Sequence, residues 1–210
     1  MAEIFRLFKL GLDQAYSDDY AQIGKDNFIQ SIEKETGTLA MYASHVYGDT
    51  SKQIVVERYA SEEAYQEHIA SQHFQAFAEL AKKAVTSREV INLVPEIFLQ
   101  KPQEMRVFEK NDLSVRLATV RVNDNAAFSD IVLPEMRASM EKESGVLIMY
   151  AGRAVDQPDT WYFFEVYQDE AAYEHHRDTA HFKDYIEKSE PFLINKDLQN
   201  LTADLLVNRG

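Results

Sequence analysis

The stretch Glu33–Ala43, EKETGTLAMYA, returns at Glu141–Ala151 as EKESGVLIMYA. A longer pair follows, in which ERYASEEAYQEHIASQHF at Glu57–Phe74 matches EVYQDEAAYEHHRDTAHF at Glu165–Phe182. The members of each pair are 108 residues apart, so the segment between the two motifs has the same length in both copies. Because this spacing is far longer than a solenoid repeat, each copy is expected to be a domain-sized unit.

Each copy is predicted to fold in the order β-α-β-β-α-β. The first copy is expected to place these elements at about 3–12, 18–35, 38–47, 53–59, from Ser61 with a further helical stretch near His73, and 89–99. The second copy is expected to repeat them at about 113–122, 125–143, 146–155, 161–167, from Asp169 with a further helical stretch near His181, and 198–207. Gly37 and Gly145 stand where a C-cap glycine ends a helix, and Pro134 is expected to break or restart the second copy's first helix.

The predicted strands are apolar on both faces. Leu147–Tyr150 and Trp161–Phe164 are apolar at successive positions, whereas a sheet with one face in water alternates. The second cover is expected to be the sheet of the other copy. The predicted fold class is therefore α+β, with two tandem ferredoxin-like modules at 1–100 and 112–210, a linker at 101–111, and antiparallel sheets packed face to face within one chain.

Composition narrows the class of protein. The net charge of −13 disfavours binding to nucleic acid or to an anionic membrane surface. Cysteine is absent, which excludes disulfides, thiolate metal sites and cysteine nucleophiles. The N-terminus carries Arg6 and Lys9 within its apolar stretch, unlike a signal peptide or a membrane span. We expect a cytoplasmic protein.

The segments ERYASEEAYQEHIASQHFQAF and EVYQDEAAYEHHRDTAHFKDY, in this order of elements, resemble the antibiotic biosynthesis monooxygenase family of dimeric α+β barrel proteins. The resemblance covers nearly the whole chain, twice. It implies that the two copies form, as an intrachain pseudo-dimer, the β-barrel that family members commonly close by dimerisation. Whether the chain pairs further as a homodimer is left open.

The resemblance implies an activity as well as a fold. The leading hypothesis is a cofactor-independent monooxygenase that acts on a small quinol or phenolic aromatic substrate and O2. Such a substrate, once deprotonated, can itself donate electrons to O2, so the protein supplies a dry aromatic pocket, hydrogen bonds and a base. The alternatives are a non-catalytic module that binds a small molecule and an isomerase that acts on a small polar metabolite.

The candidate catalytic residues come in two equivalent sets, each with a tyrosine at the end of the third strand, a histidine near the end of the following helix and a strand glutamate. They are Tyr59, His68 and Glu57 in the first copy, and Tyr167, His176 and Glu165 in the second. A neutral imidazole can act as a base near pH 7, and a tyrosine hydroxyl can bind a phenolic oxygen. The alternative for each residue is packing, capping or a structural ion pair.

Further side chains are candidates for contact with the substrate. They are Trp161, Tyr150, Tyr42, His181, His73 and Arg153, with a place in the core as the alternative for the two tyrosines. The spacing of His175, His176 and His181 is not that of a helical zinc site, so no metal site is predicted. Because Trp161, Arg153 and Arg177 have no counterparts in the first copy, the second pocket is expected to be the active one if only one is.

The resemblance also allows oxidative haem breakdown, which in this family uses an asparagine on the first strand, a tryptophan at the end of the third strand and a histidine in the last helix. This chain has Tyr59 and Tyr167 at the tryptophan position and lacks the other two residues. Haem degradation is therefore not expected.

Overall fold

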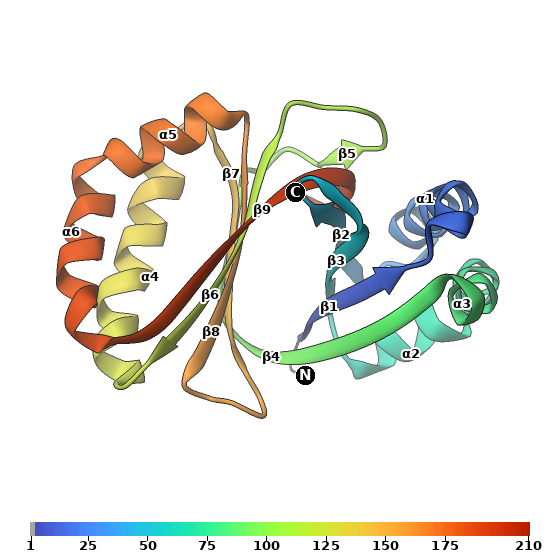
Figure 1. The fold of residues 1–210 in the computed structure, drawn as a ribbon, viewed down its shortest axis with the longest axis horizontal. Coiled ribbons are helices and arrows are strands. Elements are labelled where there is room, and N and C mark those ends of the chain that lie inside the picture. Colours follow the sequence, from blue (N-terminus) through green and yellow to red (C-terminus); the bar gives the residue numbers. More distant parts are fainter. Residues whose placement is uncertain (1–2) are drawn as a thin grey trace. The chain divides into compact units, whose positions relative to one another are not determined.

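The computed structural model describes residues 3–210 and contains two modules of the same element order (Figure 1). The first module contains β1 (Ile4–Leu12), α1 (Ser17–Lys34), β2 (Thr38–Val46), β3 (Asp49–Tyr59), α2 (Glu62–Ala70), α3 (Gln72–Ala84) and β4 (Val85–Gln100). The second contains β6 (Ser114–Val122), α4 (Asn125–Lys142), β7 (Val146–Ala154), β8 (Thr160–Tyr167), α5 (Glu170–Asp178), α6 (Ala180–Ser189) and β9 (Leu193–Asn208). The short elements are η1 (Gln14–Tyr16), β5 (Arg106–Val107) and η2 (Glu190–Phe192). The predicted α+β class with two tandem ferredoxin-like modules is confirmed.

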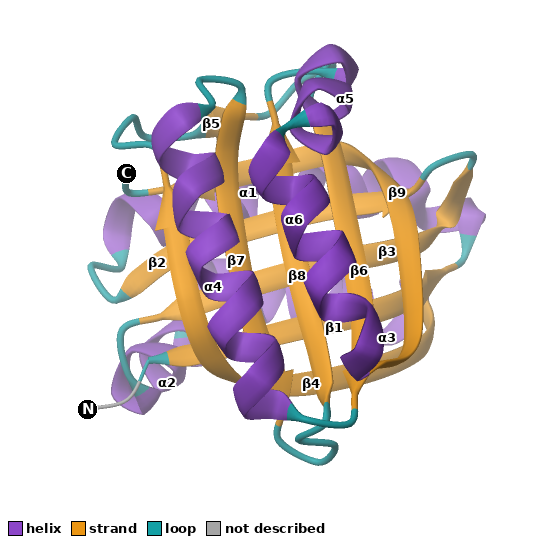
Figure 2. Cartoon of the chain, turned by 90° about the vertical axis from the view of Figure 1, so that its left-hand side faces the viewer, coloured by secondary structure: helices purple, strands orange, loops and turns teal. Residues whose placement is uncertain are grey.

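The strand order is the same in both modules. In the first module β1 lies between β3 and β4, and β2 pairs with β3, all antiparallel. In the second module β6 lies between β8 and β9, and β7 pairs with β8. Figure 2 shows α4 and α6 side by side across one face of the second sheet. The amphipathic helices therefore bury their apolar stripes against one face of each sheet.

The long last strands are shared between two compact units. Unit 1 contains the chain up to Leu93, Gln103–Asn111 and Thr202–Gly210, and unit 2 contains Val94–Pro102 and Asp112–Leu201. The second half of β4 therefore belongs to unit 2, and the end of β9 belongs to unit 1. The two units therefore differ from the modules expected at 1–100 and 112–210, because the ends of the last strands are exchanged between them. The face-to-face packing of the two sheets stays a prediction.

The repeat is in register along most of its length. From α1 to the start of β4, equivalent positions are 108 residues apart, as for Val85 and Leu193, which begin the last strands. In the first strand of each module, equivalent residues are 110 positions apart. Arg6 pairs with Glu57 as Arg116 pairs with Glu165, so Arg6 and Arg116 are equivalent. The two extra residues of the first copy lie in the connection that contains η1.

Two local expectations were wrong. Helix α4 runs through Pro134 without interruption. Pro134 is exposed, so the carbonyl left without its helical partner can be hydrated. Gly37 and Gly145 do not take the positive φ of a C-cap glycine. A Cβ on Gly37 would come within 2.3 Å of the Ala64 Cβ, so the glycine is needed for the close approach of α2.

No helix within residues 3–210 is long and apolar enough to cross a membrane.

Candidate functional site

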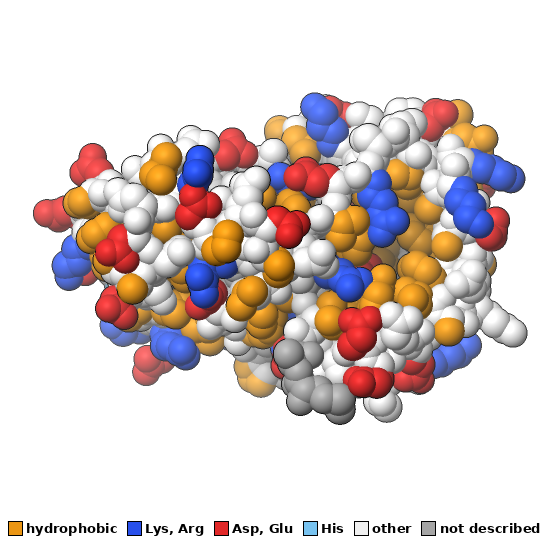
Figure 3. All heavy atoms as spheres, turned by 90° about the horizontal axis from the view of Figure 1, so that it is seen from below, with side chains coloured by type: hydrophobic (Ala, Val, Ile, Leu, Met, Phe, Trp, Pro, Cys, Tyr) orange, Lys and Arg blue, Asp and Glu red, His pale blue; other side chains and the backbone are white. Residues whose placement is uncertain are grey.

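Unit 1 contains a cavity of about 1300 Å³ between its sheet and helices α1 and α3. Its wall is mostly apolar and aromatic, with Phe8, Tyr20, Phe28, Phe74 and Phe77. On the face shown in Figure 3, hydrophobic side chains border a hollow on the right-hand side, where unit 1 lies, with Lys and Arg side chains beside it. The cavity is large enough for a multi-ring aromatic molecule.

Three substitutions between the copies explain why this space is open in unit 1. Gly24, Gln53 and Val55 line the cavity. The equivalent residues of unit 2 are Val132, Trp161 and Phe163, and all three are buried in its core. The Trp161 indole stacks on Phe163 at 5.9 Å and meets Phe128 edge to face at 5.2 Å. In unit 2 larger side chains therefore occupy part of the space that is open in unit 1, and a smaller cavity of about 810 Å³, also lined by Phe163, remains.

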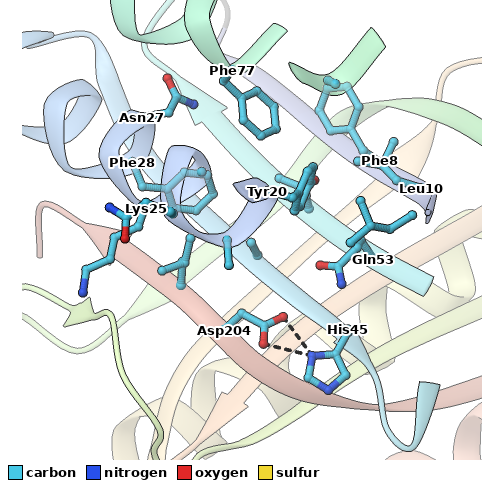
Figure 4. Close-up of a pocket in the computed structure, with 18 of the residues that line it drawn as sticks. Phe8, Leu10, Tyr20, Lys25, Asn27, Phe28, His45, Gln53, Phe77 and Asp204 are labelled. Atoms are coloured by element: carbon cyan, nitrogen blue, oxygen red, sulfur yellow. Dashed lines mark hydrogen bonds and ion pairs between the residues drawn. The ribbon is translucent and has the colours of Figure 1, made fainter. Parts of the chain in front are cut away.

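A histidine–carboxylate pair stands in the wall of the unit 1 cavity. The Nδ1 atom of His45, on β2, lies 2.9 Å from each carboxylate oxygen of Asp204, on β9. Figure 4 shows both side chains beside Gln53, at the side of the pocket opposite to Asn27 and Phe77. A carboxylate can only accept, so Nδ1 carries the proton in this pair, and in the neutral imidazole Nε2 then carries a lone pair. No hydrogen-bond partner of His45 Nε2 is found among residues 3–210.

Unit 2 has a different ion pair at the equivalent position. Arg153 corresponds to His45 and Glu96 to Asp204, and Arg153 Nε lies 2.5 Å from Glu96 Oε1. A guanidinium is always charged, so this pair cannot take up or release a proton near neutral pH. A histidine–carboxylate pair thus lines the cavity of unit 1, whereas the equivalent arginine of unit 2 forms a permanent ion pair and lines neither cavity.

The cavity wall shifts the ionisation of its carboxylates. Burial raises the pKa of Asp204, and the hydrogen bond with His45 opposes this rise. Burial also raises the pKa of Glu57, against the opposing charge of His68 and the hydrogen bond from Tyr59. Burial raises the pKa of Tyr20, and Glu57 and Asp204 add to that effect. The buried surroundings of these three groups therefore disfavour their charged forms.

A buried polar network lies behind this wall. Glu35 accepts hydrogen bonds from His68 Nδ1 at 3.0 Å, His73 Nε2 at 2.6 Å and the Thr38 hydroxyl at 2.5 Å. Burial alone would raise the pKa of Glu35, but the bonds from His68, Thr38 and His73 outweigh it and lower the pKa to about 2. The network ties α2 and α3 to the end of α1.

Unit 2 repeats this network. Glu143 accepts from His176 Nδ1 at 3.1 Å and from His181 Nε2 at 2.7 Å. Burial opposes these bonds, which nevertheless lower the pKa of Glu143. Because the network is present in both units, whereas the cavity of about 1300 Å³ lies in unit 1, its first role is to hold the helices in place.

The family model named antibiotic biosynthesis monooxygenase matches residues 4–80 and 115–188. The chain belongs to this family. A protein of Lactobacillus acidophilus NCFM, provisionally named a monooxygenase, is 33% identical over 100% of this chain and 98% of its own, with a TM-score of 0.93. A provisionally named monooxygenase of Fusobacterium nucleatum is 20% identical over 100% of this chain and 95% of its own, with a TM-score of 0.90, and shares the fold. A search of curated proteins found no match.

The catalytic residues predicted for this family member lie mostly behind the cavity wall. His68, Tyr59, His176 and Tyr167 are at most 1% exposed. The hydroxyls of Tyr59 and Tyr167 donate to Glu57 and Glu165 at 3.0 and 2.8 Å. Only Glu57 of the first set lines the large cavity, whereas Glu165 and His176 line a second cavity of about 810 Å³ in unit 2. Each set is brought together as expected, but its catalytic role stays a prediction.

The predicted substrate contacts are also largely enclosed. Tyr42 accepts from Asn208 at 2.9 Å, Tyr150 donates to Gln100, and the Trp161 indole donates to Asn125 at 2.8 Å. His73, His181 and Arg153 are held by Glu35, Glu143 and Glu96. None of these six residues lines either cavity.

Sequence reasoning did not single out the His45–Asp204 pair. The two residues are 159 positions apart, and His45 has no histidine at its repeat position. The one available signal was the difference between His45 and Arg153, because a repeat that replaces a permanent charge by a titratable one marks a possible site.

Two clusters within residues 3–210 have donor atoms close enough to hold a cation: Glu35, His68 and His73, and Glu135, His176 and His181. In each cluster the two histidines are not four residues apart along the chain, as the histidines of a helical zinc site are. The contacts of Glu35 with His68 and His73, at 3.0 and 2.6 Å, have the lengths of imidazole-to-carboxylate hydrogen bonds. Hydrogen bonding therefore accounts for this cluster, and the absence of a metal stays a prediction.

Proposed function

We propose that the chain is a cofactor-independent monooxygenase that oxidises a small quinol or phenolic aromatic molecule in the cavity of unit 1. The observation that supports this most directly is the His45–Asp204 pair in the wall of a mostly apolar cavity that contains several aromatic rings. Aromatic walls bind a flat ring and keep water from it, and the pair supplies a base at the edge of the ring.

The chemistry follows from the groups in the wall. His45 Nε2 takes the proton of a ring hydroxyl, and the Asp204 carboxylate stabilises the imidazolium that forms. The resulting phenolate is electron-rich enough to transfer an electron to O2. One oxygen atom enters the ring and the other leaves as water, while a hydroquinone becomes a hydroxyquinone. The substrate thus supplies all four electrons that O2 requires.

The test is oxygen consumption with a panel of hydroquinones and naphthols. We expect His45→Gln to lower kcat by about 100-fold, in the range for loss of a positioned base, with a smaller change in KM. The matched control is His175→Gln, because His175 is an exposed histidine on α5 of unit 2. Its turnover is expected to equal that of the wild type.

Three results are informative against this proposal. Turnover that survives His45→Gln removes the base from His45 and returns it to the predicted His68 or His176. Ligand binding without oxygen consumption supports the alternative of a non-catalytic binding module. Failure to bind any aromatic of the panel removes the substrate class altogether.

A further inference from the structure

One row of residues crosses the sheet that forms the floor of the unit 1 cavity. His45, on β2, pairs with Gln53, on β3. Gln53 also pairs with Leu10, on β1, which pairs in turn with Arg88, on β4. All four residues line the cavity, so their side chains stand on the same face of the sheet. Figure 4 shows Gln53 between Leu10 and His45. The base of the proposed reaction and an arginine therefore stand at the two ends of one row.

The length of this row sets the size of a ligand that reaches both ends. Neighbouring strands lie about 4.8 Å apart, so three strand spacings place the backbones at His45 and Arg88 about 14 Å apart. A fused-ring aromatic molecule with a polar group at each end spans this distance once a hydrogen bond is added at both ends. A single small ring can occupy only one end of the row.

The charge of Arg88 is not used by the protein. Its side chain is exposed, and it has no hydrogen bond or ion pair among residues 3–210. The guanidinium carbon lies 5.6 Å from the ring centre of Phe8, which also lines the cavity. A cation–π contact satisfies none of the N–H donors of a guanidinium. These donors are therefore available to an anionic group of a ligand.

The acidic residues of the cavity wall do not pair with Arg88. They are Asp18, Glu57, Glu109 and Asp204. Asp204 is bound by His45, and Glu57 accepts a hydrogen bond from the Tyr59 hydroxyl. Burial raises the pKa of Glu57, and the charge of Arg88 is among the effects that oppose this rise. The wall carboxylate whose charge Arg88 influences is thus one whose charged form is disfavoured by burial.

Three lysines also line the cavity: Lys25, Lys82 and Lys110. Figure 3 shows Lys and Arg side chains beside the hollow of unit 1. Positive charge around a cavity attracts an anionic ligand toward it. Lys82 is paired with Glu79 at 2.5 Å, and Lys25 stands on α1. Of the four cations, Arg88 is the one that stands on the sheet in the row of His45.

The equivalent row of unit 2 is interrupted. It runs from Arg153 through Trp161 and Val120 to Lys196. The Trp161 side chain is 1% exposed and packs among aromatic rings of the core. A ligand cannot lie along this row, and Arg153 lines neither cavity. Gln53, at the position of Trp161, leaves the row of unit 1 open.

We propose that Arg88 holds a carboxylate of the substrate while a ring hydroxyl of the same molecule lies at His45. The substrate class is then a hydroxylated aromatic carboxylic acid with fused rings. The planar guanidinium matches a carboxylate with two parallel hydrogen bonds. This inference rests on the proposed function and adds the charge and length of its substrate. Arg88 positions the ring and takes no part in proton or electron transfer.

The test compares 6-hydroxy-2-naphthoic acid with its methyl ester, which has the same rings and hydroxyl but no charge. Isothermal titration calorimetry without oxygen measures binding while no turnover occurs. We expect the wild type to bind the acid about tenfold more tightly, the low end for a hydrogen bond to a charged group because Arg88 is exposed. This preference should shrink as salt is added, since salt screens exposed charges.

Three variants locate the preference. Arg88→Gln is expected to bind the acid and the ester equally well. Arg88→Lys should keep part of the preference, because an ammonium carries the charge without the planar fork. Lys83→Gln is the matched control, since it removes the same charge from an exposed residue of α3 that does not line the cavity. It should keep the full preference. Melting temperatures show whether each variant is folded.

Each other outcome removes a stated claim. Equal affinity of the wild type for acid and ester, or a preference that persists in Arg88→Gln, overturns the role of Arg88. A preference that Lys83→Gln also loses assigns it to the general charge of the unit and overturns that role as well. If the wild type binds neither compound but binds hydroquinones, this inference alone fails. If it binds no aromatic at all, the proposed function fails with it.

Discussion

The exchange Gln53→Trp is expected to close the cavity of unit 1. Gln53 lines the cavity and donates a hydrogen bond to the Thr50 carbonyl at 2.8 Å. Its repeat position carries Trp161, which is 1% exposed and packed between aromatic rings. A tryptophan at position 53 would enter the same space beside Tyr20 and Val55. Ligand affinity should fall while the fold becomes more stable.

The size of the effect follows from the buried surface. A buried tryptophan removes about 200 Å² from water, which is worth about 5 kcal/mol at 25 cal/mol per Å². Ordering the ring costs about 1 kcal/mol, the lost hydrogen bond of Gln53 about 1 kcal/mol, and fitting the ring into a cavity not shaped for it about 2 kcal/mol. The net gain is about 1 kcal/mol, or a rise of about 2–4 °C in Tm.

The assay combines thermal unfolding with calorimetric binding of an aromatic ligand. Gln53→Leu is the matched control, because it loses the same hydrogen bond to Thr50 but fills much less of the cavity. We expect ligand affinity to fall at least tenfold in Gln53→Trp and to change little in Gln53→Leu. Unchanged affinity together with a lower Tm in Gln53→Trp would show that residue 53 does not decide which module has the larger cavity.

Two further predictions concern buried carboxylates. Burial raises the pKa of Glu135 from its ordinary value of 4.5 to about 7. The nearby charges of Glu165 and Glu143 add to this rise, and the hydrogen bond from Ser139 opposes it. Ionisation of Glu135 therefore destabilises the fold increasingly between pH 4.5 and 7. Glu135→Gln is therefore expected to be as stable as the wild type near pH 4 and more stable by up to about 3 kcal/mol at pH 8. Urea unfolding at both pH values measures this difference. Equal stability of the two proteins at pH 8 would contradict the prediction. Burial opposes the change, but the hydrogen bonds from His68, Thr38 and His73 lower the pKa of Glu35 from 4.5 to about 2. The ionised Glu35 therefore stabilises the fold fully above pH 4.5, and this stabilisation is lost as the pH falls toward 2. Glu35→Gln should lower stability by about 3 kcal/mol at pH 7 and progressively less below pH 4.5, whereas a deficit that is constant from pH 7 to 3 would mean that the carboxylate charge is not what stabilises the network.

The order of elements could be predicted from the sequence because it depends on local patterns. The side-chain caps of Ser61 and Asp169, which accept from Ala64 and Ala172, lie where the acidic helix starts predicted them. The helical continuity through Pro134 could not be predicted, since it depends on whether water reaches the freed carbonyl. The sequence indicated that position 37 requires glycine, but it predicted a helix C-cap as the reason. The structural reason is the close packing of Ala64, from a later helix, against Gly37.

The candidate site was predictable in part. The repeat motif drew attention to His68, His73, His176 and His181, and the structure joins them to Glu35 and Glu143 in two equivalent networks. Repeated residues are easy to see in a sequence, and here they tie together the helices within each module. The open cavity depends instead on the positions at which the copies differ.

The sequence by itself determined that the chain is a duplicated α+β module of one family, because register, periodicity and capping are written in neighbouring residues. Only the tertiary structure decided which module has the larger cavity. Trp161 drew attention to unit 2 as an aromatic contact for a substrate, but once folded it fills that core, and Gln53 leaves the equivalent space open. Only the fold, likewise, brings Asp204 to His45, since the end of the last strand belongs to the unit formed by the first copy. Cavities and long-range pairs arise from packed volumes, and no local pattern encodes them.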